Sequence, residues 1–528
     1  MTPAPPLILP MGERALLLEV GSLSDATALH RRLAASRPAG VVDLVPAART
    51  VLVRVDPPVL SLAAARAWIA AATTDAASVA PAEVDPIELE VVYDGADLTD
   101  TAALLGMSAD ELVRRHTDAE WTVAFTGFAP GFGYLVSPQW RYDVPRLDSP
   151  RTRVPRGSVG LAGEFTGAYP RETPGGWRLI GATSAPLFDP EAASPAPLAP
   201  GTRVRFRAVR PPVDHETATG TRDSGQTPQS RAPVAVSATG AIRVLEPGLL
   251  ATVQDLGRAG AASLGVAPSG ALDRASARTA NRLVGNPEGA AVIEATMGGL
   301  RVVALRDLWF AVAGAWGPIR LAGHEVDPYE AHAWAAGAEL HLDWFAHGAR
   351  AYLAVRGGLH AREVLGSRST DVLAGIGPER LRAGDALPVG VEPRDPIPIP
   401  ALAPWGAPHD DELEVALAPG PRADWFAASA HRALFEALWT VTNDSDRVGM
   451  RLQGPALSRV REEELPSEGM VAGALQVPPS GRPTILLADG PVTGGYPVIA
   501  VATDAALDLL AQVRPGTRLR FRHARVTG

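Results

Sequence analysis

The pattern of apolar and polar positions predicts a βαββαβ order over the first 95 residues. Four short apolar runs indicate strands, and two stretches with helical spacing each follow a residue able to cap a helix. In chain order these elements are Ala15–Val20, a helix from Asp25 to about Arg37, Val41–Val45, Val51–Val55, a helix from Ser61 to about Ala72, and Ile87–Tyr93. This is the order of the ferredoxin-like unit, so residues 1–95 are predicted to form such a module.

A run dense in glycine and proline follows this module. It contains FTGFAPGFGYL (Phe125–Leu135), VPRGSVGLAG (Val154–Gly163) and TPGGWRLIGAT (Thr173–Thr183). Glycine permits positive φ and close backbone approach, and proline presets turns, so the run predicts loops of fixed shape. Such loops often carry functional sites.

Two segments of this run are echoed near the end of the chain. PGGWRLIG (Pro174–Gly181) resembles TGGYPVIA (Thr493–Ala500), and PGTRVRF (Pro200–Phe206) resembles PGTRLRF (Pro515–Phe521). The echoes occur in the same order at similar spacing. We therefore predict two related β-domains, one over residues 96–209 and one within residues 240–528.

Between these halves, residues 210–239 contain almost no large apolar side chains and are predicted to form a flexible linker. Residues 240–528 are predicted to be mainly β. Two helices interrupt the strands, one capped by Ser269 and ending near Gly285, the other running from about Arg422 to Trp439. The expected fold class is α+β and predominantly β.

Composition excludes several chemistries. The chain has 528 residues, a net charge of −9 and no cysteine, and all 49 basic residues are arginine. Thiolate nucleophiles, a Walker A lysine, a Schiff-base lysine and a biotinylated lysine are therefore unavailable. The negative charge gives no reason to expect nucleic acid, and no apolar run is long enough to cross a membrane. A cytoplasmic protein is expected.

The segment TVQDLGR is the first candidate for catalysis. It places Gln254, Asp255 and Arg258 close together, where the aspartate is able to position water or a metal and the arginine to clamp an anion. An ion pair between a strand and a loop is the alternative. In PSGALD, the Ser269 hydroxyl and Asp273 lie near a predicted helix start, which suits anion binding or simple capping.

Two further groups are candidates for substrate or nucleotide binding. In LGSRST, Arg368 and Ser369 belong to a donor-rich loop over Ser367–Thr370 that would form either an anion-binding nest or an exposed turn. Arg356 precedes a Gly-Gly pair, where it would face either a barrel mouth or solvent.

The last group of candidates flanks the repeated Gly-Gly turns, where aromatic side chains serve either corner packing or ligand stacking. These residues are Tyr134, Glu172, Trp177, Asp489, Thr493 and Tyr496. No HExxH or paired-histidine pattern occurs, so metal ligands remain unknown, and His116 is interpreted as a helix-end residue.

Long motifs run through nearly the whole chain outside the linker. The first half carries GFAPGFGYL, SPRTRVPRGSVGLAG and TGAYPRETPGGWRLIGAT, and the second carries PGLLATVQDLGRAG, GVAPSGALDRASARTANRLVGNPEGAAVIE, AVRGGLHAREVLGSRST, SDRVGMRLQGP and SEGMVAGALQVPPSGRPTILLADGPVTGGYP. With these motifs the chain resembles the families known as allophanate hydrolase subunits 1 and 2, which correspond to the B and C subunits of 5-oxoprolinase and to the carboxyltransferase part of urea carboxylase. The resemblance implies cyclophilin-like β-barrels in both halves.

The chain also departs from the family pattern. Glu164-Phe165-Thr166-Gly167 stands where a Gly-Gln-Thr-Gly stretch is usual, and Ala182 stands where an arginine is usual. Gly490 and Pro491 replace an arginine and a glutamine. These changes remove basic and amide groups, so the exact substrate is left open.

The resemblance implies a fused B–C component of an ATP-dependent 5-oxoprolinase, which would use ATP and Mg²⁺ and the separate A component of that enzyme to convert 5-oxoproline (pyroglutamate) to glutamate. A carboxyltransferase acting on urea or a related amide is an alternative, and it would need a separate biotin carrier. A third alternative is a non-catalytic regulator of a histidine kinase. The two halves are expected to bind each other at a composite site, and a homo-oligomer is compatible with the resemblance.

Overall fold

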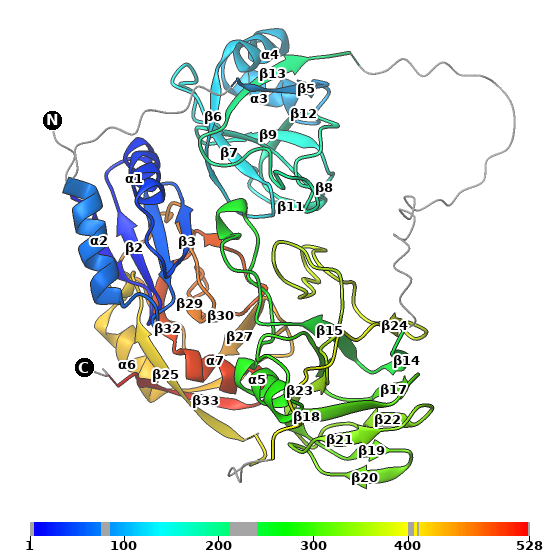
Figure 1. The fold of residues 1–528 in the computed structure, drawn as a ribbon. Coiled ribbons are helices and arrows are strands. Elements are labelled where there is room, and N and C mark those ends of the chain that lie inside the picture. The colour runs from blue at the N-terminus through cyan, green and yellow to red at the C-terminus, as the bar shows by residue number, and fades with distance from the viewer. Residues whose placement is uncertain (1–4, 75–84, 211–239, 400–405, 409–410, 526–528) are drawn as a thin grey trace, which may run out of the picture.

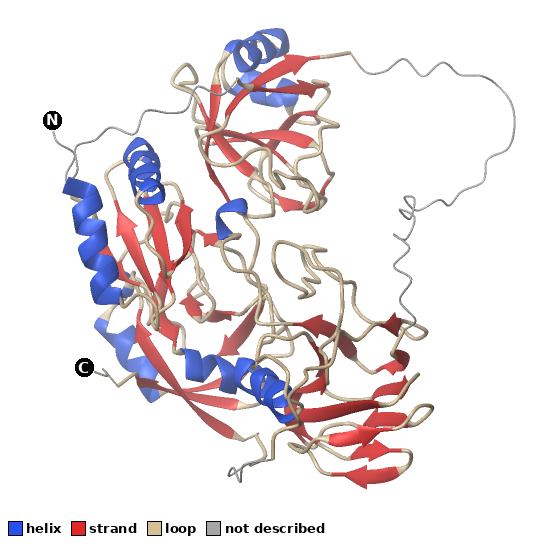
Figure 2. Cartoon of the chain, in the orientation of Figure 1, coloured by secondary structure: helices blue, strands red, loops and turns tan. Residues whose placement is uncertain are grey.

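The computed structural model describes residues 5–74, 85–210, 240–399, 406–408 and 411–525. Figure 1 shows an N-terminal module in blue, a first barrel in cyan, a β-sandwich in green to yellow-green, and a second barrel from gold to red. Strands dominate the chain, as Figure 2 shows, which confirms the predominantly β class. Of the predicted linker, residues 211–239 lie outside the described residues.

The N-terminal module is a four-stranded antiparallel sheet with the order β1-β2-β4-β3 and two helices. Its elements are β1 (Leu7–Pro10), β2 (Ala15–Glu19), α1 (Leu23–Ala35), β3 (Val41–Pro46), β4 (Thr50–Val55) and α2 (Leu62–Thr74). Helix α1 is capped by Ser22, whose hydroxyl oxygen accepts from the N–H of Asp25 at 3.2 Å. The prediction of Asp25 as the cap was therefore wrong by three residues.

The predicted fourth strand of this module belongs to the next domain. Strand β5 (Ile87–Val91) pairs in parallel with β13 (Arg203–Ala208), and Leu89 and Val91 pack into the core of the first barrel. Strand β1, which was not predicted, occupies the sheet edge beside β2. The βαββαβ assignment and the boundary at residue 95 were wrong, because an alternating pattern identifies a strand without identifying its partner.

The first barrel has the strand order β12-β9-β10-β7-β6-β13-β5. A bridge between Val92 and Ala182, with both N–H···O distances at 2.9 Å, joins its two edges. The remaining elements are α3 (Leu98–Leu104), α4 (Ala109–Asp118), β6 (Trp121–Thr126), β7 (Gly133–Val136), β9 (Ser158–Ala162), β10 (Phe165–Ala168) and β12 (Arg178–Ala182). A separate two-stranded sheet is formed by β8 (Arg151–Val154) and β11 (Thr173–Gly175).

The second barrel is closed, with the order β25-β32-β29-β30-β27-β26-β33. Its elements are β25 (Glu412–Pro419), α6 (Ala428–Glu436), β26 (Leu438–Val441), β27 (Gly449–Gln453), β29 (Ala474–Gln476), β30 (Thr484–Leu486), β32 (Val498–Ala502), α7 (Asp504–Ala511) and β33 (Arg518–His523). The helix predicted from Arg422 to Trp439 is shorter than expected, because a 3₁₀ turn over Ala423–Trp425 precedes it and Trp439 lies in a strand.

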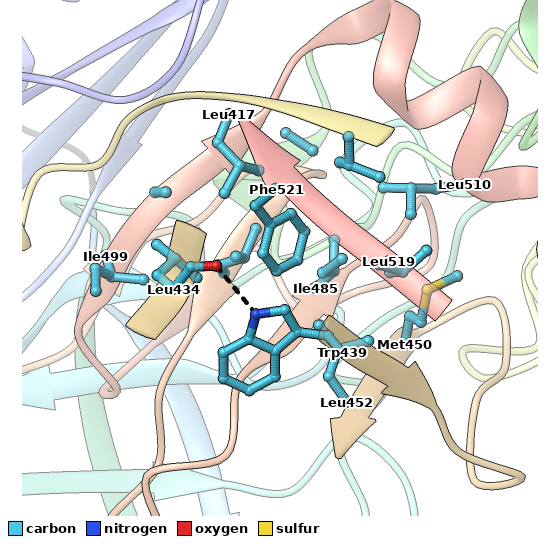
Figure 3. Packing of buried hydrophobic residues seen from close by; sticks show 14 of the residues in the cluster. Leu417, Leu434, Trp439, Met450, Leu452, Ile485, Ile499, Leu510, Leu519 and Phe521 are labelled. Carbon is cyan, nitrogen blue, oxygen red and sulfur yellow. Dashed lines mark hydrogen bonds between the residues drawn. The ribbon is translucent and has the colours of Figure 1, made fainter. Parts of the chain in front are cut away.

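The two barrels repeat each other strand for strand, which confirms the predicted duplication. In each barrel, the strand that comes first in sequence pairs in parallel with the strand that comes last. These pairs are β5 with β13 and β25 with β33. Trp121 pairs with Val204, and Trp439 pairs with Leu519 at the equivalent register. Each indole N–H donates to a carbonyl five residues earlier, at 2.9 and 3.0 Å, and Figure 3 shows the second of these bonds inside the barrel core.

The sandwich lies between the linker and the second barrel in sequence, and its two sheets bury one apolar core. The first sheet contains β15 (Leu250–Gln254), β16 (Val292–Thr296), β18 (Leu308–Trp316), β21 (His332–Trp334) and β23 (His347–Val355). The second contains β14 (Ile242–Pro247), β17 (Leu300–Ala304), β19 (Ile319–Leu321), β20 (His324–Val326), β22 (Glu339–Leu342) and β24 (Ala386–Leu387).

Helix α5 (Arg274–Leu283) packs on the sandwich and begins later than predicted. Its cap is Asp273, which accepts from the Ser276 N–H at 2.8 Å, and not Ser269. Ser269 and Gly270 have φ of 53° and 91°, so the backbone turns there and is not helical. The prediction of Ser269 as a helix cap was wrong.

The N-terminal module and the second barrel share an apolar core, although the linker and the sandwich separate them in sequence. Buried side chains of the two bodies form one cluster, which includes Met11, Leu17, Val45, Leu52, Met470, Leu486, Val498 and Val501. Arg422 adds an ion pair to Glu19 at 2.8 Å. No helix in the described part of the chain has the length and apolar character needed to cross a bilayer.

Candidate functional site between the two halves

Asp255 organises the loop after β23. Its carboxylate accepts from the hydroxyls of Ser367 and Ser369 at 2.7 and 2.6 Å and from the backbone N–H groups of Arg368 and Gly257 at 2.6 and 2.8 Å. Three of these donors come from the Ser367–Thr370 loop, for which the sequence left an anion-binding nest and an exposed turn open. The anion that they bind is Asp255 itself, so this residue fixes the loop position.

Arg258 is buried next to this loop with part of its guanidinium unused. Its Nε donates to the Val364 carbonyl at 3.2 Å, and Nη2 donates to the Ser369 carbonyl. Nη1 is buried and has no hydrogen-bond partner among the described residues. Burial lowers the pKa of Arg258, and nearby carboxylates oppose this shift, so the side chain is a cation with a donor left for a ligand.

Gln254 is fully buried and supports the same loop. Its Nε2 donates to the Thr370 carbonyl and to the Thr252 hydroxyl, both at 3.0 Å. This geometry gives Gln254 a positioning role.

Asp371 follows the loop directly and was missed by sequence reasoning. It is buried, and its Oδ1 accepts from the Ala374 N–H at 2.7 Å. Burial and the charge of Asp489 raise the pKa of Asp371 to about 6, although Arg258 and Arg171 act in the opposite direction. A carboxyl group with this pKa gains and loses a proton near neutral pH, which suits general acid–base chemistry.

Asp489 is anchored by a buried arginine. Arg447 donates to both oxygens of Asp489, at 2.8 and 3.1 Å, and to Glu294 at 2.6 Å. Glu294 also accepts from the Tyr352 hydroxyl at 2.9 Å. Arg447 and Glu294 were missed, although each lies in a motif that carries the family resemblance, because side-chain pairing over such sequence distances is not visible in a pattern.

Ser269 and Asp273 have different roles. The Ser269 N–H donates to the Ala488 carbonyl at 3.0 Å, while its fully buried hydroxyl has no partner among the described residues. Asp273 is occupied as the cap of α5 and accepts from Gln512 at 2.7 Å. Ser269 therefore stays a binding candidate, and Asp273 is a structural residue.

The glycine-rich loop of the first barrel reaches the second half. The N–H of Phe128 lies 3.3 Å from the Thr493 hydroxyl, and the N–H of Gly131 donates to the Leu264 carbonyl at 2.9 Å. Arg171 donates to the carbonyl of Leu373, two residues after Asp371. The two halves thus meet at the predicted loops.

Four further candidates make no hydrogen bond or ion pair across this junction among the described residues. Tyr134 belongs to an aromatic cluster of the first barrel, where it stacks on Phe125 at a centroid distance of 4.3 Å, and burial raises its pKa to about 12. Glu172 forms an exposed ion pair, and Tyr496 is half exposed. Arg356 donates to the Val284 and Pro393 carbonyls, both at 2.8 Å, beyond the end of α5.

Four other residues named in the sequence analysis take part in core packing or in strand pairing. Trp177 and Phe165 join the aromatic cluster around Tyr134, and Ala182 takes part in the bridge that joins the first barrel's edges. His116 is buried between the Tyr93 and Thr166 hydroxyls at 2.7 and 2.9 Å, and burial lowers its pKa to about 3. It therefore stays neutral, as expected of a packing residue.

A pocket borders this junction on the side of the N-terminal module. Its walls come from β2 and β4, from the segment between Arg258 and Arg274, and from the second barrel, where Gly490 and Pro491 line it. No group of three or more His, Cys, Asp or Glu side chains suited to a metal ion occurs in the described ranges. The pocket contains more guanidinium than carboxylate groups, which suits an anionic ligand.

The chain matches two models of the carboxyltransferase domain, that of subdomains A and B over residues 264–523 and that of subdomains C and D over residues 6–198. It is similar to the C subunit of 5-oxoprolinase from Escherichia coli K12, with 38% identity over 285 residues, which are 53% of this chain and 90% of that protein. It is similar to the B subunit of 5-oxoprolinase from Escherichia coli O157:H7, with 50% identity over 123 residues, which are 23% of this chain and 56% of that protein.

The solved structure of TTHA0988 resembles the present one along almost its entire length. The TM-score is 0.82 at 37% identity, and the match covers 96% of this chain and 99% of that chain. The two domain models match separate ranges of the chain, on either side of residues 199–263. The chain therefore belongs to the carboxyltransferase-domain family of the 5-oxoprolinase B and C subunits, with both parts fused in one polypeptide.

Proposed function

We propose that this chain is the B–C component of an ATP-dependent 5-oxoprolinase, which opens the lactam of 5-oxoproline to glutamate together with a separate A component. The observation that carries the proposal is the joint presence of B-like and C-like parts whose loops meet beside a buried arginine with an unused donor. Domain junctions are favoured places for small-molecule sites.

The proposed chemistry follows from the stability of an amide. A lactam carbonyl is a poor electrophile, and transfer of the γ-phosphoryl group of ATP to its oxygen makes the carbonyl carbon more reactive. Water then adds to that carbon, and the C–N bond breaks to give an acyl phosphate with a free amine. A second water releases phosphate, so the net reaction consumes two waters and ATP and yields glutamate, ADP and phosphate.

Arg258 is the residue proposed to neutralise charge that develops during this transfer, because its Nη1 has no partner in the described part of the chain and the sequence has no lysine to take that role. Asp371 is proposed to accept a proton from the attacking water, since its pKa is raised to about 6. Asp255 and Gln254 position the Ser367–Thr370 loop, which contacts Arg258 and directly precedes Asp371.

The donor set argues against a magnesium site built from this chain alone. Asp489 is paired with Arg447, and guanidinium groups outnumber carboxylates in the pocket beside the junction. Magnesium is commonly held by nucleotide phosphates and few carboxylates. We therefore expect ATP to bring its own Mg²⁺, and the A component to contribute to binding it.

A carboxyltransferase acting on urea or a related amide is the second candidate, favoured by the match to both carboxyltransferase-domain models. It would require carboxybiotin on another protein. A reconstituted mixture of this chain and the A component distinguishes the two: ATP-dependent glutamate formation from 5-oxoproline, without biotin, is expected. Carboxyl transfer from carboxybiotin to urea, with no glutamate formed, would replace the proposal with the second candidate, and the absence of both activities would favour a non-catalytic regulator.

A further inference from the structure

The pocket beside the junction combines an apolar wall with paired and unpaired arginines. The apolar part comes from the shared core of the N-terminal module and the second barrel, including Val45, Leu52, Leu486 and Val501. The polar part contains four arginines and three acidic residues, namely Arg14, Arg54, Arg258, Arg274, Glu13, Asp43 and Asp504. The lining therefore has an excess of positive charge.

Two of the four arginines are neutralised within the pocket wall. Arg14 pairs with Asp504, and Arg54 pairs with Asp43, to which its Nε donates at 2.8 Å. Asp43 also accepts from the Ala262 N–H at 3.2 Å, so this pair ties the module to the segment after Arg258. Arg14 and Arg54 thus belong to the scaffold of the pocket.

Arg274 and Arg258 form no ion pair among the described residues. Nearby carboxylates still act on both, Asp504 and Asp508 on Arg274 and Asp371 on Arg258. The Arg274 backbone N–H donates to Asp508 at 2.8 Å, but its guanidinium makes no hydrogen bond or ion pair within the described chain. Arg258 contributes the buried Nη1 that lacks a partner among the same residues. The unpaired buried donor of Arg258 is costly. Arg274 is only partly buried, so its guanidinium is accessible to a ligand anion.

We propose that this pocket binds the carboxylate of a small organic acid, with Arg274 as its anchor, while the apolar wall contacts the hydrocarbon part. That this acid is 5-oxoproline rests on the function proposed above. A five-membered lactam with one carboxylate has the required chemistry, with one negative charge and two apolar CH₂ groups in its ring.

The direct test is isothermal titration calorimetry of the full chain without the A component, with 5-oxoproline, glutamate, inorganic phosphate and 2-pyrrolidinone as separate probes. The last probe keeps the lactam ring and lacks the carboxylate. We expect 5-oxoproline to bind and 2-pyrrolidinone to bind at least about tenfold more weakly, since charge-assisted hydrogen bonds are lost.

Arg274→Gln is expected to weaken 5-oxoproline binding about 10- to 100-fold. The matched control is Arg282→Gln on the same helix, where the arginine pairs with Glu288 on the surface and does not line the pocket. The affinity of this control is expected to stay within about twofold of the wild type. Ala472→Met narrows the pocket from the second barrel without changing charge and is expected to weaken binding as well.

The outcomes separate this inference from the proposed function. Binding of 5-oxoproline that is unaffected by Arg274→Gln and Ala472→Met overturns the pocket assignment and leaves the proposed function standing. Arg274-dependent binding of glutamate but not of 5-oxoproline supports the pocket and contradicts the proposed substrate. Binding of inorganic phosphate alone, with no carboxylate bound, overturns the ligand class.

Discussion

Arg447 holds Asp489 through two hydrogen bonds, Nε to Oδ2 at 2.8 Å and Nη2 to Oδ1 at 3.1 Å, and both side chains are buried. Burial alone would lower the pKa of Arg447, but Glu294 and Asp489 outweigh it and the pKa is raised. The arginine therefore joins the sandwich to the second barrel as a permanent cation, and it fixes one of the two carboxylates at the junction.

Removal of this cation is expected to be strongly destabilising. Arg447→Met leaves Asp489 and Glu294 buried without their partner and should lower the free energy of unfolding by about 3–5 kcal/mol. Urea denaturation followed by tryptophan fluorescence measures the change. The control is Arg522→Met, which breaks an exposed pair with Glu414 and should cost no more than about 1 kcal/mol. Equal losses in the two variants would contradict the account of the network.

Asp371 should make stability depend on pH. Because its pKa is raised to about 6 in the folded chain, its contribution to stability is complete below its usual pKa of 3.8 and is lost as the pH rises through 6. Asp371→Asn removes this titration. Relative to the wild type, the variant should therefore gain stability between about pH 4 and pH 7, by up to about 3 kcal/mol.

The comparison uses the denaturation midpoints of both proteins across this pH range. Burial also raises the pKa of Asp508 to about 6. Asp508 titrates in both proteins, so its contribution cancels in the difference between them. Asp446→Asn, at an exposed loop position, serves as the control. A stability difference between wild type and Asp371→Asn that is independent of pH would show that Asp371 is not titrating as described.

The shared core predicts that the two halves stay together after the chain is cut. A protease site placed within residues 211–239 should yield two fragments that co-elute in gel filtration at micromolar concentration, because the N-terminal module packs its apolar side chains against the second barrel. Leu52→Asp places a charge in that core and should separate the fragments. Fragments that elute apart without this substitution would contradict the described packing.

Local patterns predicted the repeated strands well, because alternation and Pro-Gly turns act over a few residues. The echoed segments Pro200–Phe206 and Pro515–Phe521 contain the beginnings of strands β13 and β33. The partner of β5 was not predictable in this way, since its pairing with β13 joins positions far apart in the chain. Strand partners are chosen by burial in the whole fold.

The candidate site was predicted in part for the same reason. Asp255, Arg258, Ser269, Asp489 and Thr493 do gather near the junction, because the motifs that contain them are loops of fixed shape. The carboxylates of Asp273 and Asp255 accept hydrogen bonds from backbone N–H and hydroxyl groups of the chain itself. Asp371, Arg447 and Arg274 were missed because their importance comes from burial and from which charges remain unpaired, and neither is encoded in spacing.

The most direct measurement is the turnover number for glutamate formation from 5-oxoproline by this chain with the A component and ATP, compared with Arg258→Gln and with Arg301→Gln, a control on the surface of the sandwich. The account predicts ATP-dependent turnover by the wild type and the control, and a loss of about 100-fold in kcat for Arg258→Gln, since a donor to developing charge is removed. Thermal unfolding of each variant confirms that it is folded. Folded Arg258→Gln with wild-type turnover, or a wild-type mixture that forms no glutamate, would contradict the account.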